Sequence, residues 1–137
     1  MTVQRPPRIL DASALVELFA GHPELMQMLD DADAGLVLMA FPATAVLEAQ
    51  AALRAEYRMW QHFFRFPGVH VLDLTAHGAL DAGDIAAARL MHHPMQPVLT
   101  GPQMVGQVVT EAVGMNATVV TRIPELYGGH DVAVVAI

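Results

Sequence analysis

Asp11 is the residue whose type and position most clearly suggest chemistry. It ends a short apolar run at residues 9 and 10, and an apolar pattern with helical spacing begins directly after it. In a fold built on parallel strands, this places a carboxylate at the carboxyl end of the first strand, where open sheets hold their ligands. Ser13 lies two residues further on and could orient a water molecule or a metal ligand. The alternative is that Asp11 or Ser13 only caps the first helix.

Glu48 is the second candidate acid. It lies about two turns into a predicted helix that follows the apolar run 36–41 and Pro42. The adjacent residues 46 and 47 are apolar, so we expect the Glu48 side chain to point toward the edge of the sheet. The alternative is an ordinary exposed glutamate, because Glu is a good helix former. The placement of Asp11 and Glu48 after the first and second strands predicts that they face each other at the C-terminal edge of the sheet.

The elements that must position these acids follow from the apolar pattern. Short apolar runs alternate with longer amphipathic ones, which favours an α/β fold with a central parallel sheet in three α/β/α layers. Strands are predicted at residues 8–10, 36–41, 69–74, 117–121 and 132–137. Helices are predicted at 12–19, from 22 on, and at 44–58, 75–91 and 102–114, with irregular segments at 60–66, 92–101 and 122–131. Pro102 marks a helix start and Asn116 a left-handed helix end.

The composition restricts the class of protein. The 137 residues predict a single domain over 1–137, with enough apolar residues (54%) and a mean hydropathy (+0.40) typical of a packed globular core. No apolar run reaches the length of a membrane span, so we expect no membrane association. Cysteine is absent, which excludes disulfides and thiolate zinc sites. A cytoplasmic protein is the simplest expectation.

The charge restricts the class of ligand. The net charge is −7, and all seven basic residues are arginine. This argues against a general nucleic-acid-binding protein, which needs a basic surface. It still allows an acidic metal site that acts on nucleic acid, because bound divalent cations offset nearby carboxylates.

Three stretches of the chain, in order, resemble the PIN domain family of the VapC toxin type. The first is the opening Leu-Asp-Ala-Ser-Ala-Leu-Val at residues 10–16, and the second is Glu48, six residues after Pro42. The third is Asn-Ala-Thr-Val-Val-Thr-Arg at residues 116–122. The resemblance implies a small α/β/α protein of a toxin–antitoxin system, with an antitoxin protein as partner. It also implies a metal-dependent ribonuclease, in which three or four carboxylates hold Mg²⁺ or Mn²⁺. Asp11 and Glu48 match the first two acids and are then the catalytic and metal-binding residues.

The match to the family's acids is incomplete. The third acid position falls on Val105 and the fourth on Ile123. Glu111 and Glu125 are near in sequence and are the candidates to complete the metal site. The expected rim of the site is polar but uncharged and consists of Ser13, Gln103, Gln107 and Thr121. Two carboxylates leave much of a divalent charge unmatched, so we expect Mg²⁺ or Mn²⁺ binding to be weak or absent.

Two functions therefore stay open. The first is a VapC-like ribonuclease that cleaves RNA with a metal ion, with phosphate contacts from Arg54, Arg58 and Arg65. The second is a catalytically degenerate PIN module that binds a protein partner or RNA without cleaving it. In either case we expect a homodimer that buries part of the aromatic segment 57–66, because clusters of aromatic residues often mark interfaces.

Overall fold

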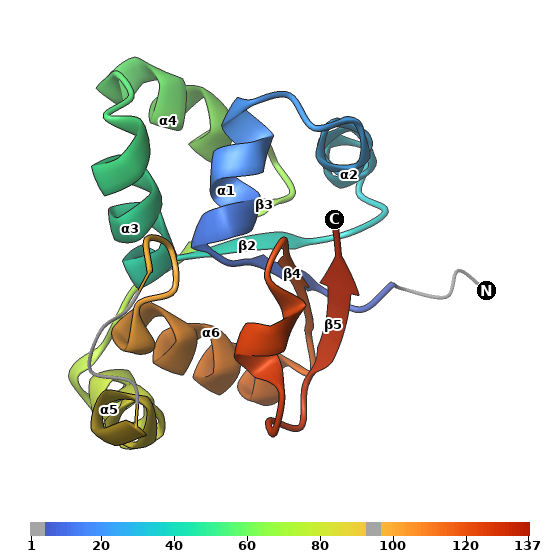
Figure 1. The fold of residues 1–137 in the computed structure, drawn as a ribbon. Helices are drawn as coiled ribbons and strands as arrows, with labels where there is room; N and C mark the ends of the chain where they lie inside the picture. Colours follow the sequence, from blue (N-terminus) through green and yellow to red (C-terminus); the bar gives the residue numbers. More distant parts are fainter. Residues whose placement is uncertain (1–4, 93–96) are drawn as a thin grey trace.

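A five-stranded parallel sheet forms the centre of the protein (Figure 1). The structure is a computed structural model that describes residues 5–92 and 97–137. Along the sheet the strand order is β3-β2-β1-β4-β5, and every neighbouring pair is parallel. The strands are β1 (Arg8–Leu10), β2 (Met39–Pro42), β3 (Val69–Leu72), β4 (Thr118–Thr121) and β5 (Ala133–Ala136). The predicted parallel sheet is confirmed, although β2 begins three residues later than predicted.

Helices cover both faces of this sheet and give three α/β/α layers. They are α1 (Ala12–Phe19), α2 (Pro23–Asp33), α3 (Ala43–Leu53), α4 (Tyr57–Phe64), α5 (Ala76–His92) and α6 (Pro102–Met115), with a 3₁₀ turn η1 (Pro124–Tyr127). In Figure 1, α1 and α2 lie on one side of the sheet, and α5 and α6 lie on the other. Pro102 opens α6, and Asn116 ends it with a left-handed φ of 51°, as the sequence predicts. Within the described residues, no helix is long and apolar enough to cross a membrane.

The segment after β2 differs from the sequence-based prediction of one helix over 44–58. It is divided into α3 and α4, and Arg54 between them adopts a left-handed φ of 52°. The Gln50 side chain explains the break, because it both donates to the Ala55 carbonyl (2.8 Å) and accepts from the Ala55 N–H (3.1 Å). The Trp60 indole N–H also donates to Gln50 Oε1, at 2.7 Å. These bonds hold the chain in a turn, so the aromatic segment begins a new helix.

Aromatic side chains join α4 to the core. Trp60 and Phe63 are buried, and their ring centres lie 4.5 and 5.0 Å from that of Phe19 on α1. The central strands are fully buried, with Ile9 and Phe41 among the largest enclosed side chains. Strands buried on both faces are typical of parallel sheets between helical layers.

The packing of α5 on α6 brings the two backbones close together. Gly106 on α6 faces the Ala82 carbonyl of α5, and a Cβ at Gly106 would collide with that oxygen. Only glycine allows this approach. The contact holds α5 against α6.

Of the predicted loop 92–101, residues 93–96 lie outside the described part of the chain.

Candidate functional site

The Asp11 carboxylate lies at the carboxyl end of β1 and is fully buried. Its Oδ1 accepts from the Ser13 hydroxyl at 2.7 Å and from the Ala14 N–H at 3.0 Å. Its Oδ2 accepts from the Tyr127 hydroxyl at 2.8 Å. The bond to Ala14 makes Asp11 the N-cap of α1, so the capping alternative describes part of its role. Both carboxylate oxygens are therefore engaged by the protein's own donors.

Tyr127 belongs to this site although sequence analysis did not select it. It ends η1, after β4, and is 2% exposed. Burial raises the pKa of the Tyr127 hydroxyl far above its ordinary value, and the charge of Asp11 and the hydrogen bond to it raise it further. The phenol therefore keeps its proton and acts as a permanent donor to Asp11. Its position just after the strand beside β1 is the one sequence signal that could have indicated it.

Glu48 lies on α3 and is half-buried. Its Oε1 accepts from the Gly101 N–H at 3.1 Å, and a Cβ at Gly101 would collide with its carboxylate. Burial is the main cause that raises the pKa of Glu48, and the negative charge of Asp11 adds to it, while the Gly101 hydrogen bond opposes both. The charges of Asp11 and Glu48 also both act on the Tyr127 hydroxyl. The charges of the two predicted acids therefore influence each other and the same Tyr127 hydroxyl.

The Ser13 and Thr121 hydroxyls, which we expected near Asp11 and Glu48, form hydrogen bonds to other groups of the protein. Ser13 donates to Asp11, accepts from the Arg122 N–H at 2.9 Å and lies 3.2 Å from Thr121 Oγ1. Thr121 is fully buried, and its Oγ1 accepts from the Ile123 N–H at 2.9 Å. These bonds connect α1 to the end of β4, so Ser13 and Thr121 stabilise the site's framework.

The two glutamines expected at the rim lie in different environments. Gln107 is buried, and its Oε1 accepts from the Thr44 N–H at 2.9 Å and the Thr44 hydroxyl at 2.6 Å. Its amide donates to the Leu72 carbonyl at 3.1 Å. Gln107 thus connects α6 to α3 and β3. Gln103 is exposed on α6.

Apolar side chains occupy the two positions where the family's third and fourth acids are expected, and both pack in or against the core. Val105 is fully buried in the core, and Ile123 is partly buried against it. Burial raises the pKa of Glu111 on α6, and Glu125 is exposed on η1. Among the described residues, no group of three or more His, Asp or Glu side chains is arranged to hold a metal ion.

Mg²⁺ and Mn²⁺ prefer several oxygen ligands with open positions for water. The donor set at the described site consists of two carboxyl groups, and the oxygens of one of them are already engaged. This donor set does not fit such an ion.

Three of the seven arginines were expected to contact phosphate groups. Arg54, Arg58 and Arg65 lie on or beside α3 and α4, where Arg58 forms an exposed ion pair with Glu56 at 2.7 Å. Arg89, near the end of α5, acts electrostatically on the Tyr127 hydroxyl. Its Nε atom is buried and has no hydrogen-bond partner in the described part of the chain.

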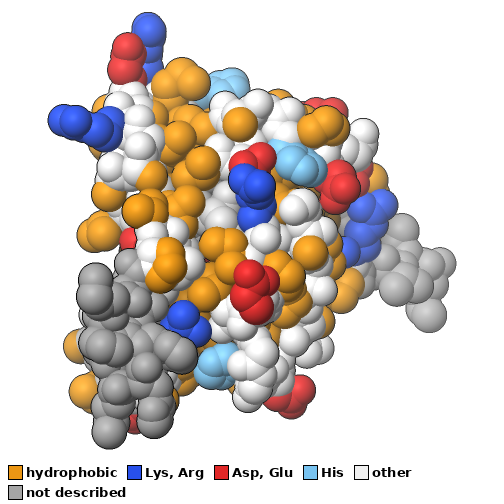
Figure 2. All heavy atoms as spheres, viewed as in Figure 1, with side chains coloured by type: hydrophobic (Ala, Val, Ile, Leu, Met, Phe, Trp, Pro, Cys, Tyr) orange, Lys and Arg blue, Asp and Glu red, His pale blue; other side chains and the backbone are white. Residues whose placement is uncertain are grey.

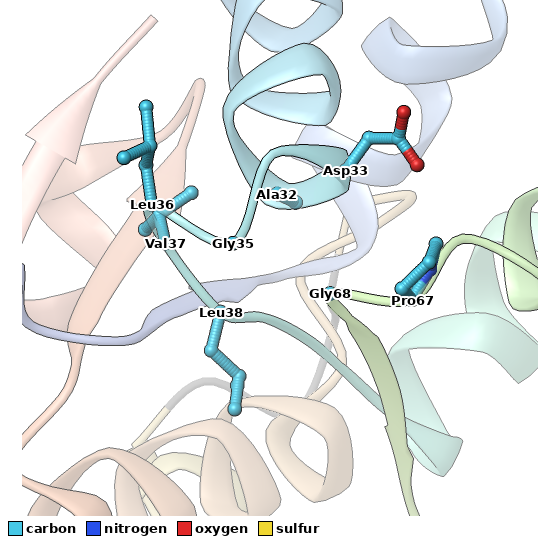
Figure 3. Close-up of a pocket in the computed structure, with 8 residues that line it drawn as sticks. All are labelled: Ala32, Asp33, Gly35, Leu36, Val37, Leu38, Pro67 and Gly68. Atoms are coloured by element: carbon cyan, nitrogen blue, oxygen red, sulfur yellow. The ribbon is translucent and has the colours of Figure 1, made fainter.

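A pocket of about 280 Å³ opens beside Ser13. Its rim carries an ion pair between Arg122 and Glu17 at 2.7 Å, and Leu99 and Ile123 provide apolar walls. A second pocket, of about 220 Å³, lies before β2 and β3, at the opposite ends of these strands from Asp11 (Figure 3). Asp33 is the one charged residue that lines it, so it holds no cluster of acids.

Comparison with solved structures supports the observed fold. No protein-family model matches the sequence, and no curated protein matches it. Among solved structures, the protein resembles a chain of DNA-bound VapBC from Salmonella typhimurium (TM-score 0.66, 13% identity), over 96% of this chain and 98% of that one. It also resembles a chain of VapBC2 from Rickettsia felis, bound to a promoter DNA fragment (TM-score 0.61, 14% identity, 95% and 98% covered). A toxin–antitoxin complex from Klebsiella pneumoniae gives a TM-score of 0.60 at 15% identity, with 94% and 96% covered. The chain therefore has the PIN-like α/β/α fold, over nearly the whole length of each of these chains.

Proposed function

We propose that this protein is a PIN-fold binding module of a toxin–antitoxin type system, without metal-dependent ribonuclease activity. One observation carries the proposal: the buried Asp11 carboxylate spends both oxygens on donors of the protein itself. Its three accepted hydrogen bonds use most of the roughly four acceptor positions of a carboxylate, which weakens Asp11 as a ligand for an ion.

The chemistry of hydrolysis supports the same conclusion. Metal-assisted phosphodiester cleavage needs an ion that activates water and stabilises the attacking and leaving oxygens. Glu48 is the other candidate carboxyl group, and one of its oxygens already accepts a hydrogen bond from the Gly101 N–H. The third and fourth acid positions carry Val105 and Ile123, which provide no oxygen ligands.

A protein partner fits the surface of α3 and α4. Tyr57 is 79% exposed and Leu47 is 68% exposed. A mainly apolar pocket of about 230 Å³ lies beside Tyr57, with Trp60 and Phe64 in its wall. Figure 2 shows hydrophobic side chains gathered on this side of the molecule. Exposed apolar patches of this kind mark interaction sites in many proteins. The solved structures that this protein resembles are toxin–antitoxin complexes, which supports an antitoxin-like protein as the partner.

The first experiment tests catalysis. The purified protein is incubated with single-stranded RNA and Mg²⁺ or Mn²⁺, alongside the Asp11→Asn variant. We expect no cleavage by either protein above the background of metal alone. Cleavage by the wild type that EDTA stops and Asp11→Asn loses would overturn the proposal in favour of the ribonuclease.

The second experiment tests partner binding. The genes on either side are searched for one that encodes a small antitoxin-like protein, the chain is co-expressed with that protein, and the complex is isolated by size exclusion. We expect a stable complex that Tyr57→Lys weakens at least tenfold. Gln103→Lys, an exposed change on α6, serves as the control and should leave binding unchanged. Equal binding by wild type and Tyr57→Lys would place the partner elsewhere.

A further inference from the structure

We infer that residues 97–101 form a strap that controls access to the pocket beside Ser13, and that Glu48 is the latch that holds this strap closed. The strap leads into α6, and in Figure 1 it is the orange loop that reaches toward α3. The inference goes beyond the proposed function, because it concerns a different site from the surface of α3 and α4 and does not require a bound partner.

The latch is a contact between the Glu48 side chain and the backbone of Gly101. Glu48 Oε1 accepts from the Gly101 N–H at 3.1 Å, and Gly101 is the N-cap residue of α6. A carboxylate is favourable at this position because the helix dipole is positive at its N-terminus. A Cβ at Gly101 would collide with the carboxylate, so only glycine lets Glu48 lie directly against the chain here. One side-chain hydrogen bond thus connects α3 to the end of the strap.

The strap itself is held in a tight turn. The Thr100 hydroxyl donates to the Pro97 carbonyl at 2.6 Å, and the Thr100 N–H donates to the same oxygen at 3.3 Å. Leu99 lies inside this turn with a left-handed φ of 68°, which is unfavourable for a residue with a Cβ. A strained backbone of this kind persists only where surrounding contacts hold it. Opening of the strap would release this strain.

Leu99 is the residue of the strap that lines the pocket beside Ser13. It packs against the core and shares the pocket wall with Val16 and Ile123. Ser13 is 3% exposed, and its hydroxyl donates to Asp11 at 2.7 Å. Moving Leu99 out of this wall would therefore widen the pocket next to Ser13 and bring solvent to its apolar lining.

The strap and the helix that follows it differ in how firmly they are held. Val98 is 76% exposed, and Leu99 is only partly buried. In α6, by contrast, Val105 and Val108 are fully buried in the core. Segments with few buried contacts open locally while the rest of a protein stays folded. We therefore expect the strap to open without unfolding of α6.

The experiment measures access to the pocket with a thiol reagent. The chain contains no cysteine, so a single introduced cysteine reports on one position. Val16→Cys places the reporter in the pocket wall. Adding Glu48→Ala, which removes the latch, should increase the labelling rate of this cysteine by about tenfold or more. Glu48→Gln keeps an oxygen that accepts from Gly101 and should restore slow labelling. Glu56→Ala, an exposed change near α4, is the matched control and should have no effect.

A second reporter separates opening of the strap from general loosening. Val109→Cys makes the same substitution at a buried position of α6 and should label slowly with either residue at position 48. Unchanged labelling of Val16→Cys in a natively folded Glu48→Ala variant would overturn the inference. A parallel increase at Val109→Cys would overturn it as well, because the whole molecule would then have loosened.

Hydrogen exchange of the unmodified protein gives the answer if the Glu48 variants fail to fold. The Gly101 N–H should exchange about tenfold or more faster than the Val109 N–H of α6, because the strap opens first. Equal exchange at the two positions would contradict a strap that opens by itself. None of these measurements uses RNA or a partner, so their failure leaves the proposed function untouched, whereas RNA cleavage would contradict the proposed function alone.

Discussion

The Tyr127 hydroxyl lies 2.8 Å from Asp11 Oδ2, although 116 residues separate the two in the chain. The contact joins the end of β1 to the 3₁₀ turn that follows β4, and both partners are buried. The contact makes Asp11 an internal hydrogen-bond acceptor between two distant parts of the chain. The stability of the protein should therefore depend on this pair.

Replacing Tyr127 by Phe should lower the free energy of unfolding by about 1–3 kcal/mol, because Asp11 Oδ2 is left buried without its donor. Urea denaturation measures the loss. The exposed change Tyr57→Phe is the control and should stay within about 0.5 kcal/mol of the wild type. In a double-mutant cycle, Asp11→Asn and Tyr127→Phe together should cost less than the sum of the two single changes. Strict additivity would show that the contact contributes nothing to stability.

The stability should also depend on the ionisation of Glu48. Burial raises its pKa above the ordinary value of 4.5, so the folded state holds the proton to higher pH than the unfolded state does. The free energy of unfolding therefore falls as the pH rises from about 4.5 through the folded-state pKa. Glu48→Gln cannot ionise, so its stability relative to the wild type should increase between pH 4 and pH 7.

Urea denaturation at several pH values measures this difference. Subtracting the two proteins removes the similar contribution of Glu111, whose pKa is raised by burial as well. Glu56→Gln, an exposed change on the same side of the molecule, is the control and should show a smaller trend. A difference between wild type and Glu48→Gln that does not vary with pH would contradict the prediction.

Gly101→Ala should destabilise the protein by about 1 kcal/mol, because the new methyl group forces the Glu48 carboxylate to move away from its hydrogen bond with the Gly101 N–H. The backbone of Gly101 (φ −58°) is one that alanine adopts readily, so the effect is steric. Adding Glu48→Ala should restore part of the loss. The control is Gly83→Ala on α5, where a Cβ meets no atom within 4 Å. That change should be neutral or stabilising by up to about 1 kcal/mol. Equal effects at Gly101 and Gly83 would contradict the predicted collision.

Gln107→Leu should cost at least about 2 kcal/mol, because it leaves the Thr44 N–H and the Leu72 carbonyl without their partners. Thermal and urea unfolding measure the loss. Gln103→Leu makes the same change at an exposed position on the same helix and should stay within about 0.5 kcal/mol of the wild type. A loss at Gln107 no larger than at Gln103 would count against the connecting role of Gln107.

The homodimer is a prediction that light scattering can test. Within the segment 57–66, Trp60 and Phe63 are buried against the rest of the chain and leave little surface for a dimer interface. Met59 is 44% exposed and is accessible to a second copy of the chain. We expect a dimer in solution that Met59→Lys weakens, and Arg65→Lys, which keeps the charge, serves as the control. A monomer at high protein concentration would contradict this prediction.

The sequence was sufficient to predict the sheet and the position of Asp11 at the carboxyl end of its first strand. Apolar runs such as 8–10 and 117–121 form strands, and the carboxyl ends of parallel strands meet at the same edge. Local patterns also predicted the left-handed end of α6 at Asn116. These features depend on neighbouring residues, which is why they can be read directly from the sequence.

The remaining features depend on contacts between distant residues. The division between α3 and α4 follows from one side chain, Gln50, that bonds across the turn. Tyr127 carries no motif and acquires its place only when η1 packs beside Asp11. Spacing along the chain could not reveal these arrangements.

The N-cap at the start of α1 bears on how short sequence motifs are interpreted. Asp11 satisfies the Ala14 N–H, and a helix start without such a cap is less stable by about 1 kcal/mol. Asp11 therefore stabilises the start of α1 whether or not the site catalyses a reaction. The four residues Leu-Asp-Ala-Ser can therefore be explained by the requirements of a helix start, and the motif by itself does not identify an enzyme.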